Sequence, residues 1–157
     1  MRVHATTVIA AAPERVWAIV SEPQRALSFM AGVTRWEVQS EHPTGLGARY
    51  RVLLRVRSAE IGGLIEVVEW DRPREIAWTS VTGIDQRGRW RLRGDGQGRT
   101  RVELRLAYGV AGSGITGWIA ERIAAPTVSG HLRQTLRQLA RMAEQEQLRE
   151  RAASRQG

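Results

Sequence analysis

The chain has 157 residues, a formal net charge of +8, six tryptophans and no cysteine. This length fits one domain, and the lack of cysteine excludes disulfides, thiol nucleophiles and zinc-thiolate sites. No apolar run approaches the ~20 residues of a membrane span. The N-terminus lacks the basic segment and apolar stretch of a signal peptide. We therefore expect a single cytoplasmic domain rather than an integral membrane protein.

The first 32 residues predict a strand followed by two short helices. Apolar and polar side chains alternate along residues 2–10, which is typical of a strand. Pro13 then occupies a first-turn position of a helix, where its missing N–H costs nothing. Pro23 breaks that helix, and Gly32 ends the second one.

The middle of the chain predicts about six consecutive strands, because alternating segments recur between turn sequences. These segments lie at about 33–40, 50–57, 62–70, 76–78, 86–93 and 100–108. From about residue 113 the apolar spacing becomes helical and predicts one long C-terminal helix. We expect residues 1–145 to form the domain, and residues 146–157 to be a frayed or disordered tail.

An antiparallel sheet of six or seven strands has an apolar face that another element must cover. The long C-terminal helix is the element that can do so. We predict an apolar cavity of roughly 300–1,000 Å³ between sheet and helix. We assign to its lining the strand residues whose alternation directs them to the inner face of the sheet, and the helix residues on an apolar side. These residues are Trp17, Leu27, Phe29, Val52, Leu54, Trp78, Trp90, Leu104, Tyr108, Trp118, Ile119 and Ile123.

Five short motifs occur in order along residues 2–145. They lie at residues 9–17, 29–33, 45–49, 69–78 and 98–102. Together with the order of elements they resemble the START-related superfamily, which includes polyketide cyclase/dehydrase-like proteins, lipid-transfer domains and the birch-pollen-allergen fold. The resemblance implies an α+β helix-grip fold with a deep apolar cavity. It also implies ligands such as sterols, lipids or polyketides; some members are cyclases or dehydratases, and some are thought to act at the ribosome or on quinones.

Few residues are candidates for catalysis or metal binding. The three histidines are scattered, with no carboxylate at metal-ligand spacing, so we predict no metal site. No phosphate loop or dinucleotide fingerprint is present, so we predict no cofactor. Glu66 is the one candidate catalytic acid or base: facing inward, it would have a raised pKa. The alternative is that Glu66 lies near the cavity mouth or pairs with an arginine of the neighbouring strand. His131 precedes the helical apolar stripe and could border the cavity.

All 24 basic residues are arginines. Several share one predicted sheet face, at Arg87, Arg89, Arg91, Arg93, Arg99, Arg101 and Arg105. Such a face could dock on phosphates. It is interrupted by Glu103 and lacks the exposed aromatic residues that stack on single-stranded bases. We favour codon bias as the explanation for the arginines.

The favoured function is the binding or transport of a hydrophobic, lipid- or polyketide-like molecule, without catalysis. One alternative is a polyketide cyclase or dehydratase that uses the same cavity. A second is a module that binds RNA, the ribosome or an anionic membrane through the arginine face. The oligomeric state and the ligand stay open.

Overall fold

The computed structural model describes residues 1–109 and 114–157, with the backbone alone for residues 114–123. The elements are β1 (Arg2–Ile9), α1 (Pro13–Val20), η1 (Pro23–Arg25), α2 (Ala26–Phe29), β2 (Val33–Val38), β3 (Arg49–Val56), β4 (Ala59–Asp71), β5 (Glu75–Ser80), β6 (Asp85–Gly94), β7 (Thr100–Gly109) and α3 (Gly114–Gln156). No helix within the described residues is both long and apolar enough to cross a lipid bilayer.

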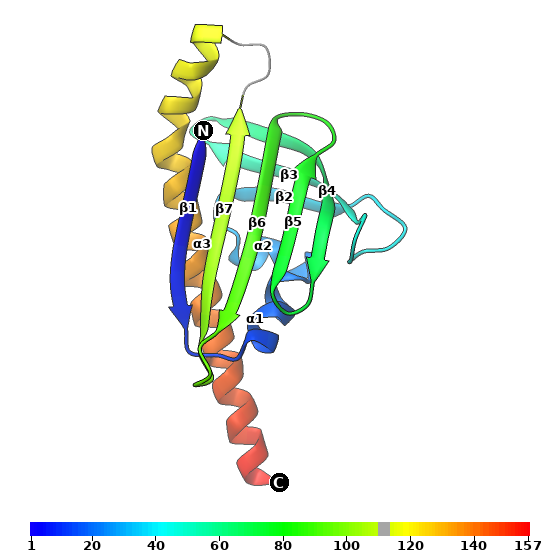
Figure 1. The fold of residues 1–157 in the computed structure, drawn as a ribbon, viewed down its shortest axis with the longest axis vertical. Coiled ribbons are helices and arrows are strands. Elements are labelled where there is room, and N and C mark those ends of the chain that lie inside the picture. The colour runs from blue at the N-terminus through cyan, green and yellow to red at the C-terminus, as the bar shows by residue number, and fades with distance from the viewer. Residues whose placement is uncertain (110–113) are drawn as a thin grey trace.

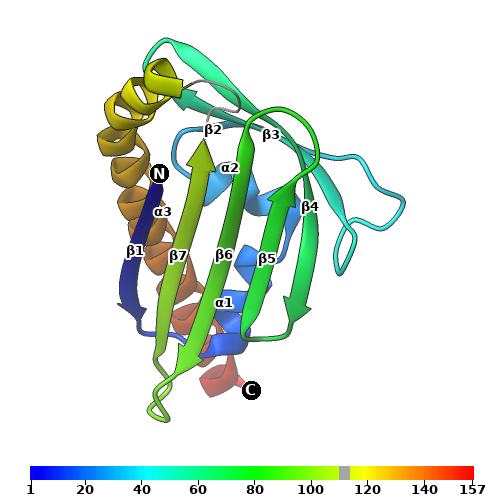
Figure 2. The ribbon, with the colours of Figure 1, turned by 45° about the horizontal axis from the view of Figure 1, so that its top comes forward.

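The seven strands form one antiparallel sheet in the order β1-β7-β6-β5-β4-β3-β2. Each strand pairs with its neighbour in sequence, except that β1 closes onto β7, so β1 and β2 are the two edges. The sheet curls, and α3 lies along its concave side next to β1 (Figure 1, Figure 2). The two short helices after β1 sit under the curl. This arrangement confirms the predicted α+β helix-grip fold.

Two β-bulges change which side chains face the interior. In β4 the register shifts between Val67 and Glu69, and in β2 it shifts between Val33 and Arg35. A bulge adds one residue to one strand, so the alternation of faces reverses beyond it. Trp70, after the bulge in β4, therefore turns toward the core, as does Trp36 in β2.

At one end of the space between sheet and α3, several described side chains are fully buried and line neither of the inner cavities that lie at the other end. We call this first end the packed end; its fully buried side chains are Ile9, Val16, Ile19, Val102 and Leu139. They come from β1, α1, β7 and α3. The buried Thr100 hydroxyl donates to the carbonyl of Ala11 at 2.7 Å, so the polar group in this core is also satisfied.

Helix α3 runs to Gln156, through the segment 146–157 for which the sequence predicted a frayed or disordered tail. Its last turns extend past the sheet (Figure 1). The side chain of Glu146 forms ion pairs with Arg15 and Arg25 of the N-terminal helical region. These long-range contacts explain why the helix continues after its apolar stripe has ended.

Candidate functional site

A cavity lies at the other end of the space, between the sheet and the first half of α3; we call this the cavity end. Its volume is about 90 Å³, smaller than the sequence predicted. Its sheet side is mostly apolar but includes the polar side chains of Gln86 and Tyr108, and α3 contributes Val128, His131, Leu132 and Thr135. A smaller cavity of about 30 Å³ lies beside it. Four side chains line both cavities, namely Met30, Trp36, Ile65 and Trp78.

The structure brings many of the predicted lining residues to these two cavities. The larger cavity is lined by Val52, Leu54, Trp78, Leu104 and Tyr108. Phe29 and Trp90 line the smaller one, together with Trp78, and the Phe29 and Trp90 ring centroids are 6.2 Å apart. These residues come from α2 and several strands, and the inward parity of the strands explains their shared position.

Other predicted lining residues lie elsewhere. Leu27 is 55% exposed, because α2 buries Ala26 and Phe29 on its inner side. Its assignment to the cavity was wrong. Trp17 is buried but lines neither cavity: it packs edge-on against Trp70, with ring centroids 5.1 Å apart.

Three further predicted lining residues belong to the start of α3. Trp118, Ile119 and Ile123 lie outside the residues whose side chains the structure describes. Their assignment to the cavity stays a prediction.

Sequence reasoning missed Trp36 and Met30. Simple alternation from Val33 places Trp36 on the opposite face, and the bulge at Thr34 reverses this. The three-residue spacing of Val33 and Trp36, with the polar pair of residues 34 and 35 between them, was the available signal. The Trp36 ring rests against Tyr50, with centroids 5.3 Å apart.

His131 supplies the imidazole ring in the wall of the larger cavity. Its Nε2 lies 2.9 Å from the carbonyl oxygen of Arg55. A carbonyl can only accept, so Nε2 donates this hydrogen bond, and Nδ1 is the ring nitrogen that is not used in it. The ring also covers Gly32, whose φ is +79° and where a Cβ would lie 2.6 Å from the imidazole. Backbone contacts on two sides therefore fix the ring in the wall.

The rest of the described wall carries no charge. Thr135 is 2% exposed, and its hydroxyl oxygen accepts from the Ala31 N–H at 2.9 Å. No carboxylate or guanidinium group lines the larger cavity in the part of the chain whose side chains are described. The site is therefore suited to an uncharged, largely apolar ligand.

Glu66 does not face the cavity. Ile65 and Val67 on either side of it are buried, so Glu66 points outward and accepts from Arg49 Nε at 3.0 Å. The sequence suggested that either Glu66 or Glu69 faces inward, because residues three positions apart lie on opposite faces of a regular strand. The bulge between Val67 and Glu69 places both carboxylates on the outer face. The alternative of an ion pair with the neighbouring strand is the correct one.

Tyr50 lies beside the smaller cavity. Its hydroxyl donates to the carbonyl of Pro43 at 2.6 Å. Burial, followed by the nearby carboxylate of Glu22, raises the pKa of Tyr50 to about 12. The phenol is therefore neutral at physiological pH and serves to hold the Trp36 ring.

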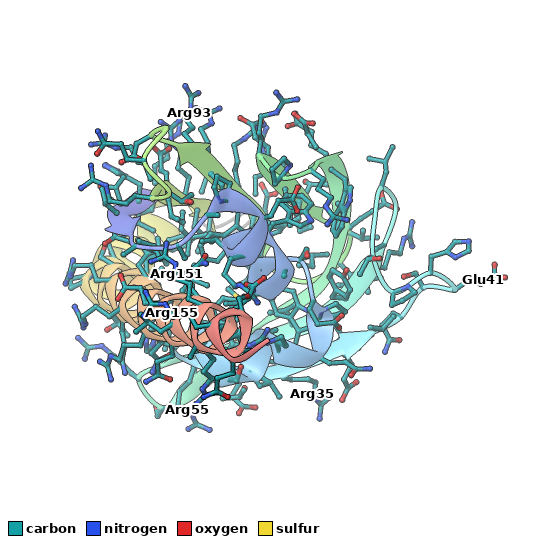
Figure 3. The ribbon with its side chains drawn as sticks, turned by 90° about the horizontal axis from the view of Figure 1, so that it is seen from below. Arg35, Glu41, Arg55, Arg93, Arg151 and Arg155 are labelled. Carbon is teal, nitrogen blue, oxygen red and sulfur yellow. The ribbon has the colours of Figure 1, made fainter. Side chains whose placement is uncertain are left out.

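Ion pairs occupy the centre of the arginine face. Glu75 accepts from Arg89 at 2.6 Å and from Arg91 at 2.7 Å, and Arg89 also reaches Glu69 at 2.7 Å. These bonds join strands β4, β5 and β6. The labelled Arg93 points into solvent (Figure 3). The face thus has a structural role at its centre.

An open hollow of about 600 Å³ lies on the same outer face of the sheet. The residues that line it include Arg2, His4, Arg87, Arg105 and Ala107. The hollow is larger than the inner cavities, but it is open to water and charged at its rim. It lacks the enclosure with which a small apolar ligand is bound.

The comparisons with known proteins agree with the fold. A family model described as "Polyketide cyclase / dehydrase and lipid transport" matches residues 1–144. No curated protein matches the chain.

Solved structures share the architecture at low sequence identity. The Thermus thermophilus protein TTHA0849 superposes with a TM-score of 0.78 at 23% identity, over 91% of this chain and 97% of that one. The Zhui aromatase/cyclase of a Streptomyces species gives a TM-score of 0.76 at 20% identity, over 92% and 93%. A START superfamily protein from Mycobacterium smegmatis gives 0.68 at 15% identity, over 94% and 97%.

At these identities the structural matches establish the fold alone. The family model covers nearly all of the described domain and agrees with the helix-grip architecture. The chain belongs to the polyketide cyclase/dehydrase and lipid transport family.

Proposed function

We propose that this protein binds a hydrophobic small molecule, lipid- or polyketide-like, in the cavity end. The observation that carries the proposal is an apolar cavity between sheet and α3, whose described wall holds no carboxylate or guanidinium group. Protein interiors are normally packed to the density of organic crystals, so a void of this kind within a domain core requires an explanation. A resident apolar ligand supplies one.

The cavity volumes set the size of that ligand. The two cavities measure about 90 and 30 Å³, and the side chains that line both include Met30. Methionine has three rotatable side-chain bonds and adapts to irregular spaces. An apolar cavity of roughly 150 Å³ takes up benzene. A one- or two-ring ligand therefore requires side chains such as Met30 to turn and join the two cavities.

Filling the cavity tests this function. The substitution Val52→Phe adds a ring to the wall of the larger cavity, and we expect it to abolish binding of the bicyclic hydrocarbon tetralin in calorimetric titrations. The matched control is Val8→Phe, because Val8 is 50% exposed on β1 and lines neither cavity. Equal tetralin affinity in the wild type and in Val52→Phe would contradict binding at this site.

A second candidate function is a cyclase or dehydratase reaction in the same cavity. The observation that favours it is His131, whose Nε2 donates to the Arg55 carbonyl and so leaves Nδ1 as the ring nitrogen that can accept a proton. The substitution His131→Gln retains an N–H donor for the Arg55 carbonyl but removes the base. Lost turnover of an aromatic polyketide substrate with unchanged tetralin affinity would support the enzyme. Unchanged turnover would exclude His131 as the base.

Binding of RNA, the ribosome or anionic membrane through the arginine face stays a prediction. The ion pairs of Arg89 and Arg91 give those side chains partners within the sheet. We therefore place this function below the two that use the cavity.

A further inference from the structure

The indole N–H of Trp36 is buried and has no hydrogen-bond partner in the part of the chain that the structure describes. An indole nitrogen can only donate. Nearly all buried donors in folded proteins are paired with protein groups or ordered water, so an unpaired one needs an explanation. Because Trp36 lines both cavities, a molecule bound in them can supply the missing acceptor for its indole N–H.

The Trp36 ring is held in this position by its surroundings. The bulge in β2 turns the residue inward, and the Tyr50 ring packs against it at 5.3 Å. Tyr50 does not serve as the acceptor in the structure, since the indole N–H has no partner among the described residues. The Tyr50 hydroxyl itself donates to the Pro43 carbonyl. The donor is thus fixed at the wall shared by the two cavities.

The charge of the wall restricts the complementary ligand. Neither cavity is lined by an arginine among the described side chains, and Glu22 lines the smaller one. A buried carboxylate or phosphate would find no guanidinium group among the described lining residues, and the His131 Nε2–H is already directed to the Arg55 carbonyl. Burying an unpaired anion is strongly unfavourable. The acceptor that fits is an uncharged oxygen.

We propose that Trp36 is a specificity-determining residue whose indole N–H donates a hydrogen bond to a carbonyl or ether oxygen of the bound molecule. The inference rests on the proposed function, and it names the ligand class more closely: an apolar molecule with a neutral acceptor oxygen, in preference to a pure hydrocarbon or a fatty-acid carboxylate. The remainder of the ligand contacts the apolar walls.

Two probes of nearly equal shape test this inference. Tetralin has no acceptor, whereas 1-tetralone carries one carbonyl oxygen. The substitution Trp36→Phe removes the N–H and keeps an aromatic ring. We expect it to weaken tetralone binding roughly fivefold relative to tetralin, since a net hydrogen bond contributes about that factor. The control Trp17→Phe changes a tryptophan that lines neither cavity, and it should leave the affinity ratio unchanged.

A second measurement uses the wild-type protein and does not depend on the variant folding. In a ¹⁵N-labelled sample the Trp36 indole proton should move downfield on saturation with 1-tetralone, and much less with tetralin. An unmoved resonance, or a Trp36→Phe variant that weakens both probes alike, would overturn the role of Trp36 while leaving apolar binding intact. Failure of both probes to bind the wild type would overturn the proposed function and this inference with it.

Discussion

The packed end and the cavity end are built from the same sheet and the same helix, yet they differ in how completely they are filled. At the packed end Ile9, Val102 and Leu139 are fully buried. At the cavity end Trp36 and Leu54 are only partly buried and face a void. The difference indicates that the packed end supplies the stability which lets the cavity end retain unfilled apolar surface.

Truncating one leucine at each end gives the largest expected effect. We expect Leu139→Ala to lower the free energy of unfolding by about 3 kcal/mol, because the fully buried site leaves a cavity on truncation. The counterpart Leu54→Ala should cost only about 1–2 kcal/mol, since Leu54 already borders a void. Urea unfolding measures both. Equal losses in the free energy of unfolding would contradict the difference in packing between the two ends.

The next effect concerns the wall of the cavity end. Gly88 lies under the Trp78 ring, and a Cβ there would overlap the indole atoms. We expect Gly88→Ala to destabilise the protein by about 1–3 kcal/mol through overpacking, and to weaken tetralin binding by displacing Trp78.

The control for that variant is Gly130→Ala in α3. A Cβ there would meet only the Arg133 guanidinium of the next turn, at 4.0 Å, and alanine favours a helix, so stability should rise by about 0.5–1 kcal/mol. Thermal unfolding of the two variants distinguishes overpacking from a general effect of the added methyl group. An unchanged midpoint in Gly88→Ala would contradict the position of Trp78.

The pH dependence sharpens the comparison at Tyr50. Its folded pKa is raised from 10.0 to about 12, so the folded state binds a proton that the unfolded state loses between those values. The stabilisation is therefore complete below pH 10 and lost as the pH rises to about 12. We expect Tyr50→Phe to flatten this decline in urea midpoints. The same slope in both proteins would exclude Tyr50 as its source.

The smallest effect is expected on the outer face. The Glu75 side chain is 24% exposed and accepts from two arginines, so Glu75→Gln should cost about 0.5–1 kcal/mol, and less at high salt. The control is Asp71→Asn, which breaks an Arg74 ion pair with both side chains more than half exposed. Its loss should be close to zero. A larger loss in the control would contradict the structural role of Glu75.

The fold followed from the sequence because it depends on long regular patterns. Alternation along β6 and β7 assigned Trp90 and Leu104 to the inner face, and the helical period after residue 113 identified the covering element. What escaped prediction depends on single residues. The bulges at Thr34 and Val68 reverse strand parity without any glycine or proline to mark them.

The candidate site was predictable to the same degree. Residues before the bulges or on unbroken strands lie at the cavities as expected, as Val52 and Trp78 show. Trp36 was missed, and Glu66 was considered as an inward acid, because each depends on a bulge in its own strand. Leu27 was misplaced for another reason: α2 has only four residues, too few for a pattern to define its buried side.

The central claim is that the cavity end holds an apolar ligand, and native mass spectrometry of the protein purified from its own host tests it most directly. We predict a complex heavier than the bare chain by the mass of one uncharged small molecule, which is released on denaturation and is absent in Val52→Phe. The bare mass alone, in a protein that also fails to bind tetralin and 1-tetralone, would contradict the claim.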